Sequence, residues 1–150
     1  EKYHSIAATG YNFDGTQVEG KWWSYPEMAA AGLWTTPSEL ILWAKEIQQI
    51  LQTQKDGLLK ATTVNEMLTP NEDSQGLGPY VLDLTFGHGG ADEGFRADLL
   101  VWKKTSNAVV IMTNSQNGNT IISEKENVIV ETQASFLASD TFSPVSALNR

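Results

Sequence analysis

The sequence contains no cysteine and only two histidines, His4 and His88. The absence of cysteine excludes disulfide bonds, thiolate metal sites and a cysteine nucleophile, and it removes any evidence about the redox compartment. Two histidines without a paired ligand spacing give little support to a metal site. Asp92 and Glu93, which follow His88 closely, are more typical of solvated turn charges. We therefore expect no metal and no other cofactor.

Long apolar runs and clusters of basic residues are also missing. No apolar run approaches the roughly 20 residues that a membrane-spanning helix needs, and no signal peptide is recognisable. Lysine and arginine number 10 against 18 acidic residues, which gives a net charge of -8. This charge disfavours binding to nucleic acid or to an anionic membrane surface. We expect no nucleic-acid partner and no membrane span.

The length and composition are those of one globular domain. A chain of 150 residues can bury a sizeable core, and a hydrophobic share of 41% is typical of folded proteins. Residues 1–30 mix glycine with polar and aromatic residues, which predicts an irregular segment lying across a surface. Within it we expect short strands at 11–13 and 17–18, joined by a turn at Asp14-Gly15. Residues 139–150 show no periodicity and are expected to form a tail.

Several aromatic residues near the first helix have two possible uses. They could line a ligand cleft, or they could pack against the body of the protein, which is the more frequent use of such side chains. These residues are Trp22, Trp23, Tyr25 and Trp34. The sequence alone leaves both uses open.

The clearest helix is predicted over residues 37–52. Thr36 supplies an N-cap hydroxyl, Pro37 suits the first helical position, and Glu39 can reach back to the cap. Apolar residues then recur at the three-four spacing of a helix face. They are Leu40, Trp43, Ala44, Ile47 and Leu51.

The rest of the chain predicts an α+β fold. A second capping pattern begins at Thr63 and predicts a short helix closed by Pro70. Strands follow at 80–85, 96–103 and 107–113, and a weaker helical pattern covers 120–138. The last of these strands is apolar without alternation, which predicts a central strand covered on both faces. Strands grouped beside helices indicate an antiparallel β-sheet with flanking helices.

One glycine-rich stretch surrounds His88. Four glycines between residues 86 and 94 remove side chains from the backbone around one imidazole, so another molecule could approach that backbone closely. Histidine is also the side chain whose unperturbed titration lies nearest neutral pH. One interpretation is the edge of a functional site. The other is a flexible turn between two strands, with His88 solvated or bound to a backbone carbonyl.

Five segments, in this order, resemble the C-terminal half of the penicillin-recognising serine hydrolases. The segments are Ala30-Ala31-Gly32-Leu33-Trp34-Thr35-Thr36-Pro37-Ser38-Glu39-Leu40, Met67-Leu68-Thr69-Pro70, Gly76-Leu77-Gly78, Gly87-His88-Gly89-Gly90 with Gly94-Phe95, and Val109-Val110-Ile111-Met112-Thr113-Asn114. The similar branch contains class C β-lactamases, DD-peptidases and related esterases. The resemblance covers residues 7–138, and it implies a β-lactamase-like or transpeptidase-like fold of which residues 1–150 form a single partial domain.

The resemblance also implies a site. The family uses Ser-x-x-Lys, Tyr-x-Asn or a similar element, and Lys-Thr-Gly or His-x-Gly on an edge strand. Only the third motif is present, as His88-Gly89-Gly90, and we expect the nucleophile upstream of residue 1. By resemblance, the Ala91 N–H is one oxyanion donor, and His88 replaces the family's lysine near the substrate carboxylate or the catalytic tyrosine. A histidine in place of the family's lysine makes the charge at this position depend on pH. Gly89 stands where the family has threonine, so no hydroxyl is present there to bind a substrate carboxylate. The resemblance therefore does not imply specificity for β-lactams.

Two functions remain as hypotheses. The first is the C-terminal part of a periplasmic or secreted serine hydrolase, a relative of the penicillin-binding proteins, acting on a β-lactam, peptide or ester. This chain alone would be inactive, because nucleophilic catalysis needs the missing nucleophile and base. The second is a noncatalytic binding or assembly module of the same fold. Under the first hypothesis, a half-domain would leave its sheet edge and apolar surface uncovered, which predicts self-association or strand exchange.

Overall fold

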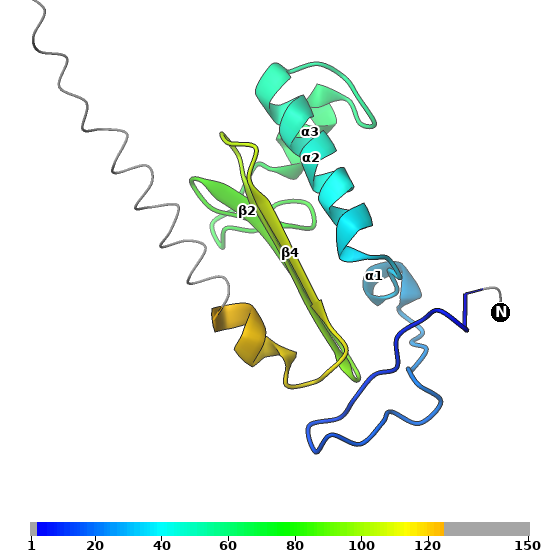
Figure 1. Ribbon diagram of the computed structural model, residues 1–150. Helices are drawn as coiled ribbons and strands as arrows, with labels where there is room; N and C mark the ends of the chain where they lie inside the picture. The colour runs from blue at the N-terminus through cyan, green and yellow to red at the C-terminus, as the bar shows by residue number, and fades with distance from the viewer. Residues whose placement is uncertain (1–2, 125–150) are drawn as a thin grey trace, which may run out of the picture.

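The computed structural model describes residues 3–124 and shows one antiparallel sheet with helices beside it (Figure 1). The elements are α1 (Met28–Ala31), α2 (Pro37–Thr53), α3 (Ala61–Met67), β1 (Tyr80–Val81), β2 (Thr85–Asp92), β3 (Phe95–Trp102) and β4 (Ala108–Thr113). A further helix starts at residue 118 and is described as far as 124. The predicted α+β class, with an antiparallel sheet and flanking helices, is confirmed. Most of the predicted helix at 120–138 and the predicted tail at 139–150 lie outside the described residues.

The strands follow the order β1-β2-β3-β4, and every neighbouring pair is antiparallel. In Figure 1, α1, α2 and α3 lie on one side of the sheet, and the helix that starts at residue 118 lies on the other. No helix among residues 3–124 is long and apolar enough to cross a membrane.

The first turn of α2 is closed by a reciprocal pair of hydrogen bonds. The Glu39 N–H donates to the Thr36 hydroxyl over 3.2 Å, and the Thr36 N–H donates to the Glu39 carboxylate over 3.1 Å. Pro37 occupies the first turn, where its missing N–H leaves no partner unsatisfied. The helix ends at Gln54, which adopts the left-handed conformation with φ 54°. The prediction for 37–52 is therefore confirmed, with one more residue at the end.

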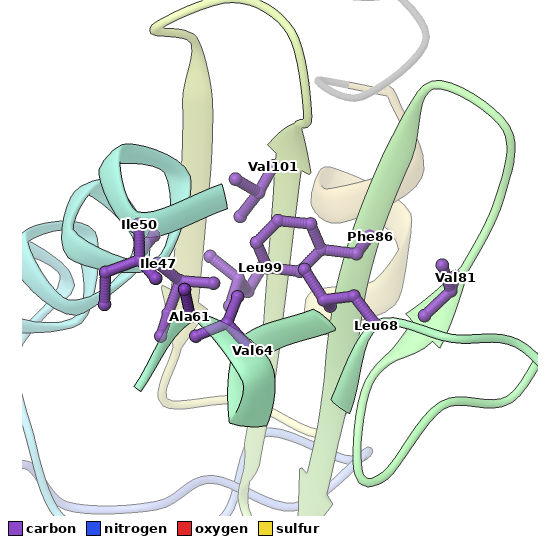
Figure 2. Close-up of a cluster of buried hydrophobic side chains, with 10 residues drawn as sticks. Ile47, Ile50, Ala61, Val64, Leu68, Val81, Phe86, Leu99 and Val101 are labelled. Atoms are coloured by element: carbon purple, nitrogen blue, oxygen red, sulfur yellow. The ribbon is translucent and has the colours of Figure 1, made fainter. Parts of the chain in front are cut away.

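The core lies between α2, α3 and the helix-facing side of the sheet. Phe86 of β2 and Val101 of β3 are fully buried and point toward Ile47 of α2 and Val64 of α3 (Figure 2). Burying an apolar side chain of this size contributes about 1.5–3 kcal/mol. Because Phe86 begins the inward face of β2, this packing fixes which side chains of that strand face the helices.

The start of α3 differs from the prediction. The helix begins at Ala61, with Lys60 at the N-cap, and Thr63 lies inside it. The Asp56 carboxylate accepts a hydrogen bond from the Ala61 N–H over 2.9 Å and so satisfies the first turn from the preceding loop. The N–H groups at the start of a helix can bond to any suitably placed acceptor. In α3 that acceptor is Asp56, and the capping pattern at Thr63 does not mark the start of the helix.

The strand predicted at 80–85 was wrong in its extent. β1 contains only Tyr80 and Val81, and the chain then turns, with the Leu82 N–H donating to the Thr85 carbonyl over 2.9 Å. β2 begins at Thr85 and continues through the whole glycine-rich stretch. The turn in the second interpretation of this stretch is therefore wrong, because the stretch is itself a strand, whereas an exposed His88 beside a backbone carbonyl is what that interpretation expected.

The last strand occupies a different place from the one expected. β4 is the final strand of the described sheet, and every residue in it is half buried. A central position with both faces covered was the prediction, and it is wrong for the described residues. An apolar run without alternation can therefore occur in a strand that pairs along one edge only.

The N-terminal segment is irregular, as predicted, and it attaches to the tip of the β2–β3 hairpin. The expected strands at 11–13 and 17–18 reduce to one bridge between Tyr11 and Gln17. The turn at Asp14-Gly15 is confirmed, with φ 83° at Gly15. The Tyr11 N–H donates to the Gly94 carbonyl over 3.3 Å and joins this segment to the hairpin.

Candidate functional site

The candidate site is the part of β2 that β1 does not cover. β1 pairs only with Phe86 and Gly87, whereas β3 pairs with β2 along its whole length. Among the described residues, no strand pairs with residues 88–92 on the β1 side. We call this stretch, residues 88–92 of β2, the open edge. It contains all the residues that the sequence predicted for the site, namely His88, Gly89, Gly90 and Ala91.

The direction of each backbone group on the open edge follows from the hairpin register. Asp92 and Phe95 flank the two-residue turn 93–94, so they form a pair that exchanges backbone hydrogen bonds. Bonded and non-bonded pairs alternate along an antiparallel ladder. Gly90 therefore bonds to β3, while Gly89 and Ala91 direct their N–H and C=O groups away from it.

Two hydrogen bonds farther along the sheet support this alternation. The Thr85 carbonyl, in step with Gly89 and Ala91, accepts from Leu82 on the side away from β3. The Trp102 N–H, on the residue opposite Thr85, donates to the Asn107 carbonyl over 3.1 Å, beyond the end of β4. Both bonds show that Thr85 directs its backbone groups away from β3, and Gly89 and Ala91, which lie four and six residues farther along the strand, do the same.

Neighbouring residues limit the open edge at both ends. At one end Gly87 pairs with Tyr80 of β1. At the other end the Glu93 N–H donates to the Tyr25 hydroxyl over 2.8 Å. Only Gly89 and Ala91 are left to offer outward backbone donors and acceptors along this edge.

His88 is exposed, and its ring turns toward the same edge. It shares the inward face of β2 with Phe86 and lies opposite the buried Leu99 of β3, yet its own side chain is exposed. Its Nδ1 lies 2.6 Å from the Gly89 carbonyl oxygen. Gly89 and Gly90, which follow it, have no side chains, so the outward backbone groups and the imidazole are both accessible.

A row of aromatic rings begins at the closed end of this hairpin. Phe95 meets Trp34 edge to face at 5.7 Å between ring centroids, and Trp34 meets Trp22 in the same way at 5.1 Å. Trp34 remains 50% exposed and Trp23 56% exposed. Of the two uses expected for these aromatic residues, the structure shows packing toward the hairpin for Trp34 and Trp22 and a hydrogen bond to the hairpin for Tyr25, whereas Trp23 is largely exposed. A hollow lined in part by Trp22 lies near His4 and does not include the open edge.

The arrangement can bind an extended backbone or a single oxyanion, and residues 88–92 themselves contain no serine, threonine or lysine. Ala91 and Gly89 each offer an N–H on a strand without bulky side chains, which is the geometry of a hydrogen-bond donor site for developing negative charge. The sequence contains no Ser-x-x-Lys to supply a nucleophile and base. Within residues 3–124 no three side chains of the metal-binding types come together.

Two features of the site escaped the sequence prediction. One is the outward direction of Gly89, which follows from counting residues back from the turn at 93–94. The other is the Tyr25 hydroxyl that closes the end of the edge, for which the sequence holds no local signal, because 68 residues separate Tyr25 from Glu93.

Comparisons with protein-family models, with curated proteins and with solved structures gave no match. The geometry of the open edge and the residues that form it are therefore the basis for inferring a function.

Proposed function

We propose that this chain is the C-terminal part of a serine hydrolase related to the penicillin-recognising enzymes. It contributes the His88-Gly89-Gly90 strand and the Ala91 N–H as one oxyanion donor. The nucleophile, whose own N–H would be the second donor, belongs to a segment encoded upstream of residue 1. The observation that carries this proposal is the outward Ala91 N–H on a strand edge with little side-chain cover.

The position of His88 supports the same assignment. Acyl transfer places negative charge on a carbonyl oxygen, and the substrates of such enzymes often carry a carboxylate as well. His88 stands at the start of the open edge, two residues from Gly90, where a polar or cationic side chain can reach a group bound along the strand.

The exposed apolar surface supports a missing half-domain. Leu33 is 78% exposed and Leu42 66% exposed, on either side of the start of α2, and Leu82 is 52% exposed beside β1. Covering exposed apolar side chains with another piece of protein is favourable. An N-terminal half that brings the nucleophile to β2 would supply such cover for the side chains near it.

The chemistry assigned to the complete protein is acyl-enzyme hydrolysis. The serine hydroxyl gives its proton to the upstream base and attacks the carbonyl carbon of a β-lactam, peptide or ester, and the Ala91 N–H stabilises the oxygen as it becomes negative. The C–N or C–O bond then breaks, the amine or alcohol takes up the proton, and water attacks the acyl-enzyme to release the acid and restore the serine. Loss of one such donor reduces kcat by about 10²–10³ in a serine hydrolase. A periplasmic or secreted location is part of this proposal.

The first test is the coding sequence upstream of residue 1, which should encode Ser-x-x-Lys. The longer protein should then be labelled by a fluorescent penicillin or should turn over a nitrophenyl ester. Ala91→Pro, which removes the N–H, should lower that activity by about 10²–10³, whereas Ala91→Ser, which keeps it, should not. Labelling or turnover by the 150-residue chain alone would contradict the proposal.

A noncatalytic binding or assembly module remains the second candidate. The observation that favours it is the same open edge, which can add a strand from another chain through backbone hydrogen bonds alone. An upstream sequence without Ser-x-x-Lys would favour this candidate over the enzyme.

A further inference from the structure

We propose that the open edge pairs antiparallel with the open edge of a second copy of this chain. The two-fold axis would pass between Gly90 of each copy, and the two four-stranded sheets would become one continuous sheet. A two-fold contact of this kind uses the same patch twice, so each residue pair occurs in both directions. The inference does not depend on the proposed catalytic role, because it follows from the backbone and side chains of β2.

The backbone allows one register for this pairing. Counting strand partners within residues 3–124, only Gly89 and Ala91 have outward groups without one, so Gly89 must lie opposite Ala91 of the second copy. Each such pair exchanges two backbone hydrogen bonds, and the two pairs together make four. A shift by two residues would place Ala91 opposite Gly87, or Gly89 opposite Glu93. The outward groups of those residues are already engaged by Tyr80 and Tyr25.

The side chains are complementary in this same register. On the helix-facing side, His88 lies opposite Asp92 of the second copy, and Asp92 lies opposite the second His88. The imidazole can donate a hydrogen bond to the carboxylate in each pair, and opposite charges in facing positions stabilise a sheet. Gly90 faces Gly90 at the axis, so no side chains collide there. On the other side Ala91 faces Gly89, which also leaves room.

The edge carries little that would prevent such pairing. Natural sheet edges are usually protected by lysine, proline, a bulge or a covering loop. From His88 to Ala91 the open edge has no lysine and no proline, and these four residues are all exposed. His88 now contacts its own Gly89 carbonyl, so in the dimer the ring would exchange this contact for Asp92 of the second copy.

Pairing would cover the Ala91 N–H. One consequence rests on the proposed catalytic role: a dimer that covers this N–H could not also use it as an oxyanion donor. Association of two copies would then compete with the binding of substrate or of the missing half-domain. The pairing itself can be tested without any activity assay.

The first experiment measures the mass of the full chain by size-exclusion chromatography with light scattering over a series of concentrations. The wild type should shift from monomer to dimer as concentration rises. Ala91→Pro should stay monomeric, because proline removes an N–H that faces away from β3 and is tolerated at such an edge position. Ala91→Ser keeps the N–H and should dimerise like the wild type. Circular dichroism should show the same fold in all three.

The second experiment tests the register through a charge exchange. His88→Asp places two carboxylates opposite each other in both pairs, and it should weaken the dimer by about tenfold or more. The double variant His88→Asp with Asp92→His restores an opposite pair at each position and should recover most of the lost affinity. A wild type that is monomeric at every concentration, an Ala91→Pro variant that still dimerises, or a double variant no better than the single one would overturn the proposal.

Discussion

The side-chain amide of Gln48 in α2 donates to the carbonyl of Trp102 at the end of β3, over 2.8 Å and across 54 residues of sequence. The same nitrogen also lies 3.0 Å from the Thr105 carbonyl and 2.7 Å from the Asn107 carbonyl. Gln48 is 3% exposed. One buried amide therefore joins the long helix to the turn between β3 and β4.

We predict that Gln48→Leu lowers the free energy of unfolding by about 1–3 kcal/mol, because it leaves the Trp102 carbonyl without its donor, while the Asn107 and Thr105 carbonyls keep the Trp102 N–H and the Gln52 amide. Urea denaturation followed by circular dichroism measures this change. The control is Gln49→Leu on the exposed side of α2, which should change stability by no more than about 0.5 kcal/mol. Equal effects of the two substitutions would show that the buried amide has no special role.

We predict that Gly94→Ala destabilises the hairpin tip more than Gly15→Ala does. Both glycines have φ near 80°, at 82° and 83°, so alanine at either position meets the same backbone strain. A Cβ on Gly94 would lie 2.6 Å from Val18 and 2.7 Å from the Gly10 Cα, whereas a Cβ on Gly15 would meet nothing within 4 Å.

The strain common to both substitutions is about 1–2 kcal/mol. The crowding at Gly94 should add about 1–3 kcal/mol, and it should detach the N-terminal segment from the hairpin. Thermal unfolding of the two variants side by side measures the difference. Equal stability of the two variants would show that the N-terminal segment does not contact the hairpin closely at Gly94.

We predict a pH-dependent contribution of Glu39 to stability. The Thr36 N–H that donates to Glu39 lowers the pKa of this carboxyl below its ordinary value of 4.5, and the hydroxyls of Thr35 and Thr36 lower it further. A carboxyl whose pKa is lower in the folded state stabilises the fold above its unfolded pKa, and this stabilisation is lost as pH falls through the folded pKa.

The advantage of the wild type over Glu39→Gln should therefore be full at neutral pH and should shrink as the pH falls below 4.5. Denaturant unfolding of both proteins over a pH series measures it. The control is Glu19→Gln, an exposed carboxyl outside the helix. A difference that stayed constant with pH would rule out the charged form of Glu39 as its source.

The sequence predicted α2 well because its signals are local. The cap hydroxyl, the proline and the glutamate lie within four residues, and the apolar spacing needs no knowledge of the partner. The start of α3 was missed because Asp56 supplies the acceptor from the preceding loop. The place of β4 in the sheet was missed because burial of a strand depends on what pairs and packs with it, and the strand's own sequence does not contain that information.

The resemblance predicted that His88-Gly89-Gly90 lies on an edge strand, whereas the local sequence left a turn equally open. Glycine lowers strand propensity, so residues 87–90 first suggest a turn as readily as a strand. The pairing of this stretch with β3, whose apolar residues include the buried Leu99 and Val101, makes it a strand. The short length of β1 then leaves the edge open, and no local pattern predicted that β1 would end at Val81.

The central claim is that Gly89 and Ala91 direct their N–H groups to an open edge while Gly90 and Asp92 bond to β3. Hydrogen exchange of these four amides, measured by NMR on a sample dilute enough to be monomeric, tests it most directly. We predict fast exchange at Gly89 and Ala91 and slow exchange at Gly90 and Asp92. Protection of the Ala91 amide in the monomer, or equal rates at Ala91 and Gly90, would contradict the account.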